Sequence, residues 1–277
     1  MNPLLIPAAI ALTVAAILFI IFMRYEAGNV VLETIKLTDA NENLRILHIS
    51  DVHIKLKTVP TAKITLMIRD SAPDIVVMTG DYINRPKDVR AFLAWMGEIA
   101  EAAGGAGIYM CYGNHDAHAF LKSPDLKREL TKRLKQMGAY VLENRSLTFT
   151  HRERLYTVTG FTDYFAQRRN GVRQALKDAP KGAHYHIGIS HNPDIALELD
   201  GPRPDLLLLG HFHGGQIWLP FHLEYTCLRR EYLCKLGVRK GLHSFGGRLL
   251  YISRGLGCVL FPLRLGSRPE ITLLIVP

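Results

Sequence analysis

Five apolar runs in the sequence end in side chains whose types could bind a metal ion or transfer a proton. One such end is weak evidence, because a His on a strand is more often a core residue and Asn and Asp are common in turns. Five ends in one chain indicate a shared site. We assign the core interpretation to His48, His184 and His186, which lie inside the runs. The runs and the residues that follow them are LRILHIS with Asp51 and His53, DIVVMTG with Asp81, GIYMCYG with Asn114, His115 and Asp116, HYHIGIS with His191, and PDLLLLG with His211 and His213.

The residue types indicate the chemistry of this shared site. Two Asp, one Asn and four His form a mixed set of oxygen and nitrogen ligands, adequate for two divalent ions if one carboxylate bridges them. No Cys belongs to the set, which argues against a structural zinc finger and for a catalytic centre with positions open to water and substrate. The metal could be Mn, Fe, Zn or a mixture, because His and Asp accept all three.

The pattern between the runs predicts the elements that position these residues. The runs have the length of strands, and helical periodicity separates them near 61–71, 86–103, 123–137, 165–178 and 193–199. Alternating strands and helices predict an α/β layered fold with a sheet covered on both faces. Ligands bind beyond the carboxyl ends of strands in such sheets, so all five clusters can converge on one site. A small residue precedes each cluster, where the backbone must turn closely: Ser50, Gly80, Gly113, Ser190 and Gly210.

The N-terminus is expected to form a transmembrane anchor. Pro3–Met23 carries no charged side chain, and at about 1.5 Å per residue it reaches roughly 30 Å, the thickness of a bilayer core. A signal peptide would have a basic start, a shorter apolar stretch and a better cleavage site. The nearby basic residues follow the span, which favours a single-pass protein of the inner membrane with a cytoplasmic catalytic domain. The expected domains are the anchor at 1–24, a linker and first strand region at 25–43, and the catalytic domain at 44–277.

The chain is basic, and its C-terminal part contributes most of the charge. The formal net charge is +9, and residues 217–277 contain nine Lys or Arg against three Glu. Such a surface attracts nucleic acid, anionic lipid headgroups or a phosphorylated substrate. The sequence has no evident nucleic-acid-binding motif and has a predicted membrane span, so lipid or substrate is the preferred interpretation.

The order of the five clusters resembles the calcineurin-like metallophosphoesterase superfamily. The likeness continues through GHFHGGQIWLP, YISRGLG and RPEITLL, and so covers nearly everything after the anchor. These flanks resemble the membrane-associated branch that includes phosphodiesterases and a UDP-2,3-diacylglucosamine pyrophosphohydrolase of lipid A biosynthesis. The resemblance implies an α/β fold, a four-layer sandwich of two mixed β-sheets flanked by helices. The matching series is Asp51-x-His53, Gly80-Asp81, Gly113-Asn114-His115-Asp116, His191 and Gly210-His211-x-His213.

The resemblance also implies a role for each matched residue. A water between the two ions would become a hydroxide and attack phosphorus in line. His115 matches no ligand position and would donate a proton to the leaving oxygen, and Asp116 would hydrogen-bond its ring. The implied ligands are Asp51, His53 and His213 for one ion, Asn114, His191 and His211 for the other, and Asp81 as the bridge.

The implied reaction is hydrolysis of a phosphoester or pyrophosphate bond, and the substrate is predicted from the C-terminal part. The segment IWLPFHLEYTCLRREYL interleaves apolar residues with Arg229 and Arg230, which suits an interfacial surface that holds acyl chains and phosphates together. An ordinary core is the alternative for its apolar residues. We predict a lipid-linked substrate such as UDP-2,3-diacylglucosamine. The candidate substrate contacts are His118, Phe221, Arg229, Arg230 and Arg254.

Other functions remain open at this point. The same two-metal centre suits a soluble phosphodiester or nucleic acid, although the composition makes nucleic acid a less favoured partner. A non-catalytic scaffold with this fold is a further alternative, but a scaffold is expected to have lost some ligands, and none is missing. The sequence does not indicate the oligomeric state.

Overall fold

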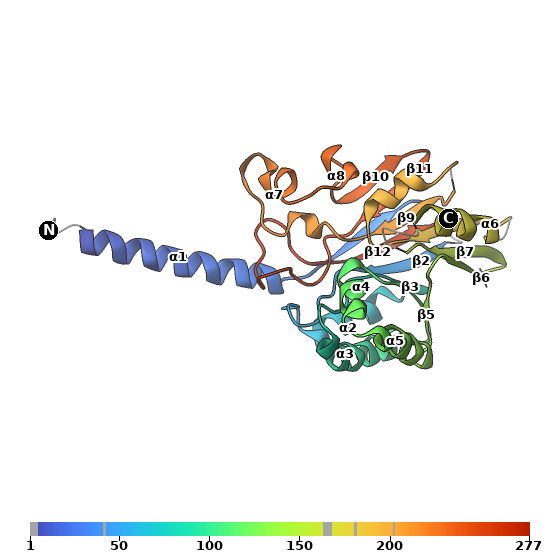
Figure 1. Ribbon diagram of the computed structural model, residues 1–277, viewed down its shortest axis with the longest axis horizontal. Helices are drawn as coiled ribbons and strands as arrows, with labels where there is room; N and C mark the ends of the chain where they lie inside the picture. Colours follow the sequence, from blue (N-terminus) through green and yellow to red (C-terminus); the bar gives the residue numbers. More distant parts are fainter. Residues whose placement is uncertain (1–4, 41–42, 163–167, 180–181, 202) are drawn as a thin grey trace.

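Two mixed six-stranded sheets face each other, and helices flank them on both outer sides (Figure 1). This arrangement confirms the four-layer sandwich that the resemblance implies. The computed structural model describes residues 5–40, 43–162, 168–179, 182–201 and 203–277. In pairing order, the first sheet contains β1 (Val31–Lys36), β12 (Glu270–Val276), β2 (Leu44–Ile49), β3 (Ile75–Thr79), β4 (Gly107–Cys111) and β5 (Ala139–Val141). The second contains β10 (Gly241–Phe245), β11 (Arg248–Ile252), β9 (Leu206–Leu209), β8 (Tyr185–Ile189), β7 (Arg154–Gly160) and β6 (Arg145–His151).

The helices expected near 61–71, 86–103 and 123–137 are all present. The helix expected near 193–199 is a 3-10 helix, and part of the one expected near 165–178 lies outside the described residues. The α-helices are α1 (Leu5–Gly28), α2 (Thr61–Ser71), α3 (Val89–Ala102), α4 (Asn114–Leu121), α5 (Pro124–Gln136), α6 (Arg168–Asp178), α7 (Leu223–Thr226) and α8 (Tyr232–Lys235). The 3-10 helices are η1 (Pro86–Asp88), η2 (Pro193–Glu198), η3 (His213–Gly215) and η4 (Pro220–His222).

Three apolar clusters separate the four layers. The first, which includes Leu47 and Phe92, joins the first sheet to α2, α3 and α5. The second, with Ile46 and Leu208, fills the space between the two sheets. The third, with Ile195, joins the second sheet to α6 and η2. Successive side chains of β2 enter different clusters because a strand points alternate residues to opposite faces.

The core assignment for the three strand histidines is correct for two of them. His48 is 0% exposed and His186 is 5% exposed. His184 is exposed, because β8 begins one residue later, at Tyr185, so its core assignment is wrong.

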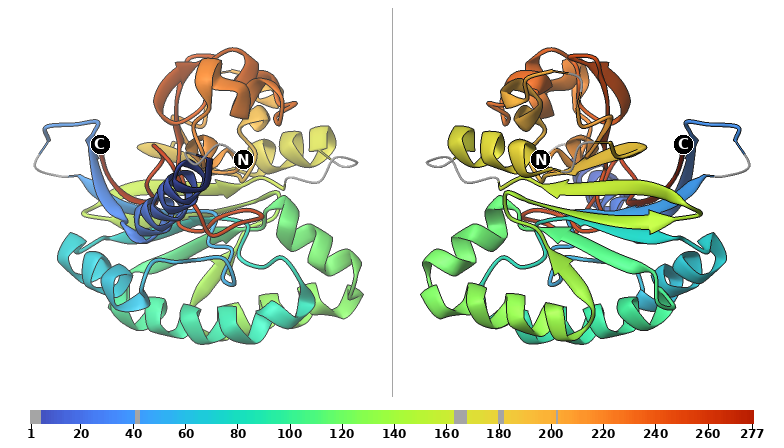
Figure 2. Two further views of the ribbon diagram at one scale, coloured as in Figure 1. Left: turned by 90° about the vertical axis from the view of Figure 1, so that its left-hand side faces the viewer. Right: turned by 90° about the vertical axis from the view of Figure 1, so that its right-hand side faces the viewer.

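The carboxyl ends of the central strands lie at the end of the sandwich from which α1 projects. β1 begins at Val31, directly after α1 ends at Gly28. β1 runs parallel to β12, and β12 runs antiparallel to β2. β2 therefore runs back toward α1, and β3 and β4 lie parallel to it. The left view of Figure 2 looks at this end of the molecule, with α1 in front.

α1 is long and apolar enough to cross a membrane, by its length and composition. It has 24 residues, and none of the residues in its most apolar part is buried. Only its last turns contact the sandwich, where Met23 and Ala27 are buried. The helix is therefore separate from the core that holds the two sheets together.

Candidate metal centre

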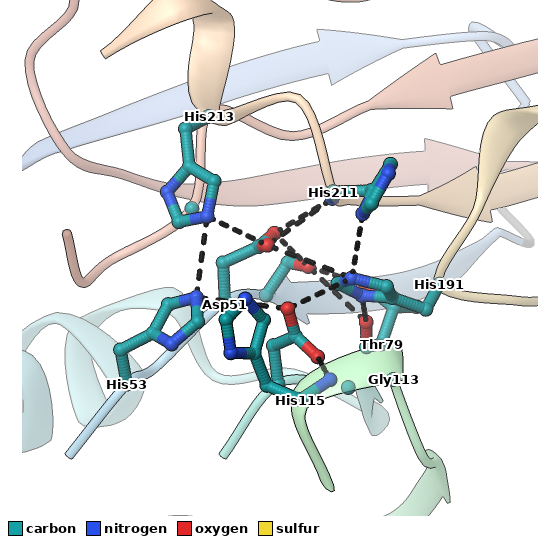
Figure 3. A network of polar contacts seen from close by, with 12 residues as sticks. Asp51, His53, Thr79, Gly113, His115, His191, His211 and His213 are labelled. Atoms are coloured by element: carbon teal, nitrogen blue, oxygen red, sulfur yellow. Dashed lines mark hydrogen bonds and ion pairs between the residues drawn. The ribbon is translucent and has the colours of Figure 1, made fainter. Parts of the chain in front are cut away.

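The residues that follow the five strand ends converge in space (Figure 3). Their ligand atoms form three overlapping groups, in each of which all atoms lie within 4.8 Å of one another. The sequence-predicted cluster thus forms one site, between the carboxyl ends of the two facing sheets. The groups are Asp51 with His53 and His213, His53 with Asp81 and His115, and Asp81 with His191 and His211.

Sharp backbone turns aim these side chains at one another. Asp51, Asp81 and His211 have φ angles of 50°, 57° and 77°, in the left-handed region that residues other than Gly rarely adopt. Strained conformations of this kind persist where the surrounding structure holds them, and they concentrate at functional sites. A Cβ added to Gly113 would lie 2.2 Å from Asp81 Oδ1, so a glycine is required before Asn114.

Asp51, His53 and His213 form the first group of candidate ligands, and all three are buried. His213 Nε2 lies 3.1 Å from Asp51 Oδ1 and 3.2 Å from His53 Nε2. His53 Nδ1 lies 3.0 Å from Asn84 Oδ1, which accepts its proton and leaves His53 Nε2 with a free lone pair. Two imidazole nitrogens bound to one ion at about 2.0–2.1 Å lie roughly 3 Å apart. The arrangement therefore fits a metal ion.

Asp81 lies between the first group and a second one. Its Oδ2 is 3.6 Å from His53 Nε2 and 3.0 Å from His191 Nε2. His191 Nδ1 donates to the Thr79 carbonyl oxygen at 2.8 Å, so Nε2 carries the lone pair that faces Asp81. This is the position that a bridging carboxylate would occupy.

His211 and Asn114 complete the second group. His211 Nδ1 lies 3.2 Å from His191 Nε2, again with two ring nitrogens facing each other. Asn114 Oδ1 is buried and has no hydrogen-bond partner among the described residues. A buried amide oxygen without a partner is costly unless it binds an ion or water. These atoms would hold the second ion, together with Asp81.

The electrostatics of the pocket produce the protonation states that metal ligands need. Burial lowers the pKa of His53 to about 4 and also lowers the pKa values of His211 and His213, so these rings are neutral. Burial alone would raise the pKa of Asp51, but His213 and its neighbours hold that pKa well below the usual range. The pKa of Asp81 is lowered in the same way by nearby imidazoles. Charged carboxylates and neutral imidazoles are the metal-binding forms.

His115 lies beside the first group, with its ring 4.9 Å from that of His53. The Asn84 amide connects the two rings: its oxygen accepts from His53, and its Nδ2 donates to His115 Nδ1 at 3.1 Å. A neutral His115 ring that accepts at Nδ1 carries its proton on Nε2. That proton is available to a leaving oxygen. Asn84 is a residue that the sequence analysis does not identify.

Asp116 has different partners from those expected. Its carboxylate accepts hydrogen bonds from four backbone N–H groups, at distances of 2.8–3.0 Å. Burial and the nearby Asp81 charge raise the pKa of Asp116 to about 7. The expected hydrogen bond to the His115 ring is replaced by the contact with Asn84, and Asp116 instead fixes the loop that carries Asp81. Its four donors are the N–H groups of Asp81, Tyr82, Ile83 and Gly113.

Glu231 is a second residue that the sequence analysis does not identify. Its Oε1 accepts from His211 Nε2 at 2.7 Å, which leaves His211 Nδ1 free to face the second ion position. Asp194 holds Glu231 in place by accepting from the N–H groups of Tyr232 and Leu233 at 2.7 and 2.9 Å, at the start of α8. Carboxylates that orient a metal-binding His raise its basicity and fix its tautomer.

The five candidate substrate contacts are spread over different places. His118 lines an apolar cavity of about 420 Å³ that also borders Asn114 and His211. Arg229 lies over the Phe212 ring, 5.7 Å from its centroid. Arg230 and Phe221 are exposed. Arg254 instead forms ion pairs with Glu33 and Glu270, so its charge is already neutralised by the first sheet.

A second cavity, of about 610 Å³, borders His115 and Asn84. Its lining includes Lys55, Arg85 and Lys87, whose side chains form no ion pair with a described residue. The lining also includes one acidic residue, Asp88, whose carboxylate accepts from the Asn84 and Arg85 N–H groups. The two cavities therefore differ in character: one beside Asn114 is mainly apolar, and one beside His115 is basic.

Comparison with known protein families identifies this centre. The family model described as calcineurin-like phosphoesterase matches residues 44–215, which include every strand-end residue discussed above. The chain belongs to this family. It is a metal-dependent phosphoester hydrolase, and the clustered His and Asp side chains agree with the two metal ions on which the family depends.

Three relatives extend the similarity beyond the matched residues. The chain is 32% identical over 274 residues to the uncharacterized metallophosphoesterase YkoQ of Bacillus subtilis (strain 168), covering 95% of this chain and 97% of the relative. It is 30% identical to the phosphodiesterase YaeI of Escherichia coli (strain K12), covering 83% and 81%. It is 28% identical to the UDP-2,3-diacylglucosamine pyrophosphatase LpxG of Chlamydia trachomatis, covering 83% of each chain.

Proposed function

We propose that the protein hydrolyses a phosphoester or pyrophosphate bond in a lipid-linked substrate, with UDP-2,3-diacylglucosamine as the best single candidate. One observation carries this proposal: the metal centre lies at the same end of the sandwich as α1. With α1 inserted in a bilayer, the carboxyl ends of β2, β3 and β4 point toward the membrane. A substrate whose phosphate sits at the headgroup level is then the one that the site can reach most directly.

The two cavities support an amphiphilic substrate. The apolar cavity beside Asn114 suits an acyl chain or another apolar group. The basic cavity beside His115 suits an anionic group, because Lys55, Arg85 and Lys87 offer charge-assisted hydrogen bonds. A phosphate between the two ligand groups would have both cavities within reach.

The chain's own residues would hold the two ions in position and donate a proton to the leaving oxygen. When bound, the two ions would activate a water and offset negative charge on the phosphoryl oxygens. Asp51, His53 and His213 would hold one ion, Asn114, His191 and His211 the other, and Asp81 both. His115 Nε2–H would donate to the leaving oxygen, while Asn84 keeps its ring oriented through Nδ1.

The relatives support a phosphoester or pyrophosphate hydrolase and suggest two substrate classes, a lipid-linked pyrophosphate and a phosphodiester. LpxG of Chlamydia trachomatis is a UDP-2,3-diacylglucosamine pyrophosphatase, which agrees with the lipid-linked proposal. YaeI of Escherichia coli is a phosphodiesterase, which favours a soluble phosphodiester as the second candidate. For the orientation we propose a cytoplasmic catalytic domain, since Arg24 and Lys36 both follow the span.

The test is a substrate comparison on the purified full chain in detergent micelles. We expect the highest kcat/KM for UDP-2,3-diacylglucosamine, a lower value for its deacylated counterpart, and loss of all activity on chelation of the metal. A bis(p-nitrophenyl) phosphate assay and a single-stranded DNA assay serve as the soluble alternatives. Equal kcat/KM values for the acylated and deacylated substrates would refute the lipid proposal and leave the phosphoesterase activity standing.

A further inference from the structure

The last turns of α1 are fixed to the loop that precedes β12. The Arg264 N–H donates to the Met23 carbonyl oxygen at 3.2 Å, and the Gly266 N–H donates to the Glu26 carboxylate at 3.0 Å. An Arg24 guanidinium N–H donates to the Pro262 carbonyl oxygen at 3.2 Å. Hydrogen bonds at three successive points hold the helix in one orientation relative to the sandwich.

A second loop is joined to the first through Gln216. Its Nε2 donates to the carbonyl oxygens of Val259 and Leu263 at 3.0 and 3.2 Å, and its Oε1 accepts from the Val259 N–H at 2.7 Å. The Trp218 N–H donates to the Leu265 carbonyl oxygen at 3.0 Å. Residues 216–223 and 258–266 are therefore joined as one unit, in which the loop 258–266 is hydrogen-bonded to the end of α1; we call this unit the collar.

The collar holds large apolar side chains in the solvent. Phe221 is 92% exposed, Leu260 is 80% exposed and Phe261 is 63% exposed. Phe221 and Leu260 also have positive φ angles of 56° and 63°, which cost free energy in residues other than Gly. A protein surface in water gains nothing from strained loops that expose Phe and Leu. Several large exposed apolar residues on two joined loops mark an interaction site.

We propose that the collar is a membrane-contact surface, which seats the catalytic domain on the lipid bilayer that α1 crosses. This inference rests on the anchor role of α1 in the proposed function. Phe261 is adjacent in sequence to Pro262, which is hydrogen-bonded to Arg24 at the end of the apolar helix. The position where the bilayer must end along α1 is thus the position of the collar. A second protein is a less suitable occupant, because any bilayer around α1 already covers this place.

The collar also determines how a substrate enters. Val259 and Leu260 line the basic cavity that borders His115. With the collar in the interface, this cavity opens at headgroup level, where apolar residues contact acyl chains and Lys55 and Arg85 meet phosphates. A lipid headgroup then reaches His115 directly from the bilayer surface.

The experiment measures the depth of labelled collar residues in phosphatidylcholine–phosphatidylglycerol nanodiscs that contain the full chain. Single cysteines carrying an environment-sensitive fluorophore replace Phe221 or Phe261, in a Cys227→Ser background that removes the exposed native thiol. Phe19→Cys on α1 is the positive control, and Thr150→Cys on β6, at the opposite end of the strands, is the negative control. Spin-labelled lipids with shallow or deep nitroxides act as quenchers.

We expect labels at 221 and 261 to lose emission mainly to the shallow quencher, and the label at 150 to neither quencher. The label at 19, about 6 Å inside the end of the apolar span, should lose a larger share to the deep quencher than the collar labels do. Quenching at 19 without quenching at 221 and 261 overturns the collar proposal and leaves the anchor intact. No quenching at 19 overturns the anchor and the collar together.

A Phe261→Ser variant adds a functional readout. Its KM for an acylated substrate embedded in vesicles should rise about tenfold, because less apolar area of the protein contacts lipid. Turnover of soluble bis(p-nitrophenyl) phosphate, which needs no bilayer, should not change. An unchanged KM for the embedded substrate, or an equal loss on both substrates, would contradict a role in membrane contact.

Discussion

The catalytic core, residues 44–215, and the collar use side chains in opposite ways. In the core, Val77 and Leu208 are 0% exposed, and charged residues such as Asp51 are buried as well. In the collar, Phe221 and Leu260 remain largely exposed. The core matches the family model, whereas the collar lies outside the matched residues.

This difference indicates how the protein divides its tasks. Burial in the core fixes the positions and protonation states of ligands for one reaction that a whole family performs. The exposed apolar side chains of the collar are not among the candidate ligands, and they lie in loops that are joined by hydrogen bonds to the end of α1. Glu231 lies outside both regions, beyond the matched residues, and contacts the core at His211.

The largest effect should follow from the residue between the two ligand groups. Asp81→Ala should lose both ions, and turnover should fall by more than about 10³-fold, because no remaining side chain can bridge the two positions. Elemental analysis of the purified variant checks this, with Asp70→Ala on α2 as a control that keeps its metal. Full metal occupancy in the Asp81 variant would contradict the bridging position.

His115→Ala should separate chemistry from metal binding within the core. The variant should keep its metal and lose about 10²–10⁴ in kcat, the usual contribution of a positioned general acid. The loss should be smaller for p-nitrophenolate, which leaves without a proton, than for an alkoxide leaving group. His184→Ala, an exposed histidine directly before β8 and at the opposite end of the strand from the site, is the control. Equal losses for both leaving groups would exclude His115 as the acid.

Two side-chain truncations, one in the core and one in the collar, compare how much each region contributes to the free energy of unfolding. Leu208→Ala leaves a cavity between the sheets and should lower the free energy of unfolding by about 2–5 kcal/mol. Phe221→Ala should change it by no more than about 0.5 kcal/mol, because its side chain is already exposed. Denaturant unfolding in the same detergent measures both. A large loss for Phe221→Ala would show that the collar stabilises the fold.

Glu231→Gln tests a contact that the core receives from beyond the matched residues. Loss of the carboxylate should weaken metal affinity about 10–100-fold at the His211 position and leave the other ion unaffected. Metal competition with a chelator of known affinity measures the two steps separately. Glu224→Gln, which removes a buried carboxylate that accepts from the Leu219 N–H, is the matched control. Equal weakening of both ions would mean that Glu231 acts only on stability.

The sequence predicts which side chains cluster, because each candidate ligand closely follows an apolar strand. The sequence does not identify Asn84 and Glu231, because they become neighbours of their partners only after folding. These partners are His53, His115 and His211. The same limit applies to Asp116 and Arg254, whose charges pair with backbone N–H groups or distant carboxylates.

The outer strands are also difficult to predict from the sequence. β6 has the sequence RSLTFTH and β10 the sequence GLHSF, and both are edge strands with mixed polar and apolar residues. Such strands lack the continuous apolar runs of β3 or β9, which are buried on both faces. The sequence allows the apolar residues of the segment 217–233 to be either an interfacial surface or ordinary core. Both occur: Tyr225 and Leu233 are core, whereas Phe221 and Leu228 are exposed. The domain boundaries at residues 24 and 43 stay predictions.

The most direct test of this division compares acyl preference between the wild type and a collar variant. The quantity is the ratio of kcat/KM for a diacylated pyrophosphate substrate to that for its deacylated counterpart, measured in detergent micelles. The wild type should favour the diacylated substrate, and Phe221→Ala with Leu223→Ala should bring the ratio toward one, because both side chains lie in the exposed collar. If the wild type shows no preference, or if the double variant loses both activities alike, the collar does not select the substrate and a soluble phosphodiester becomes the better assignment.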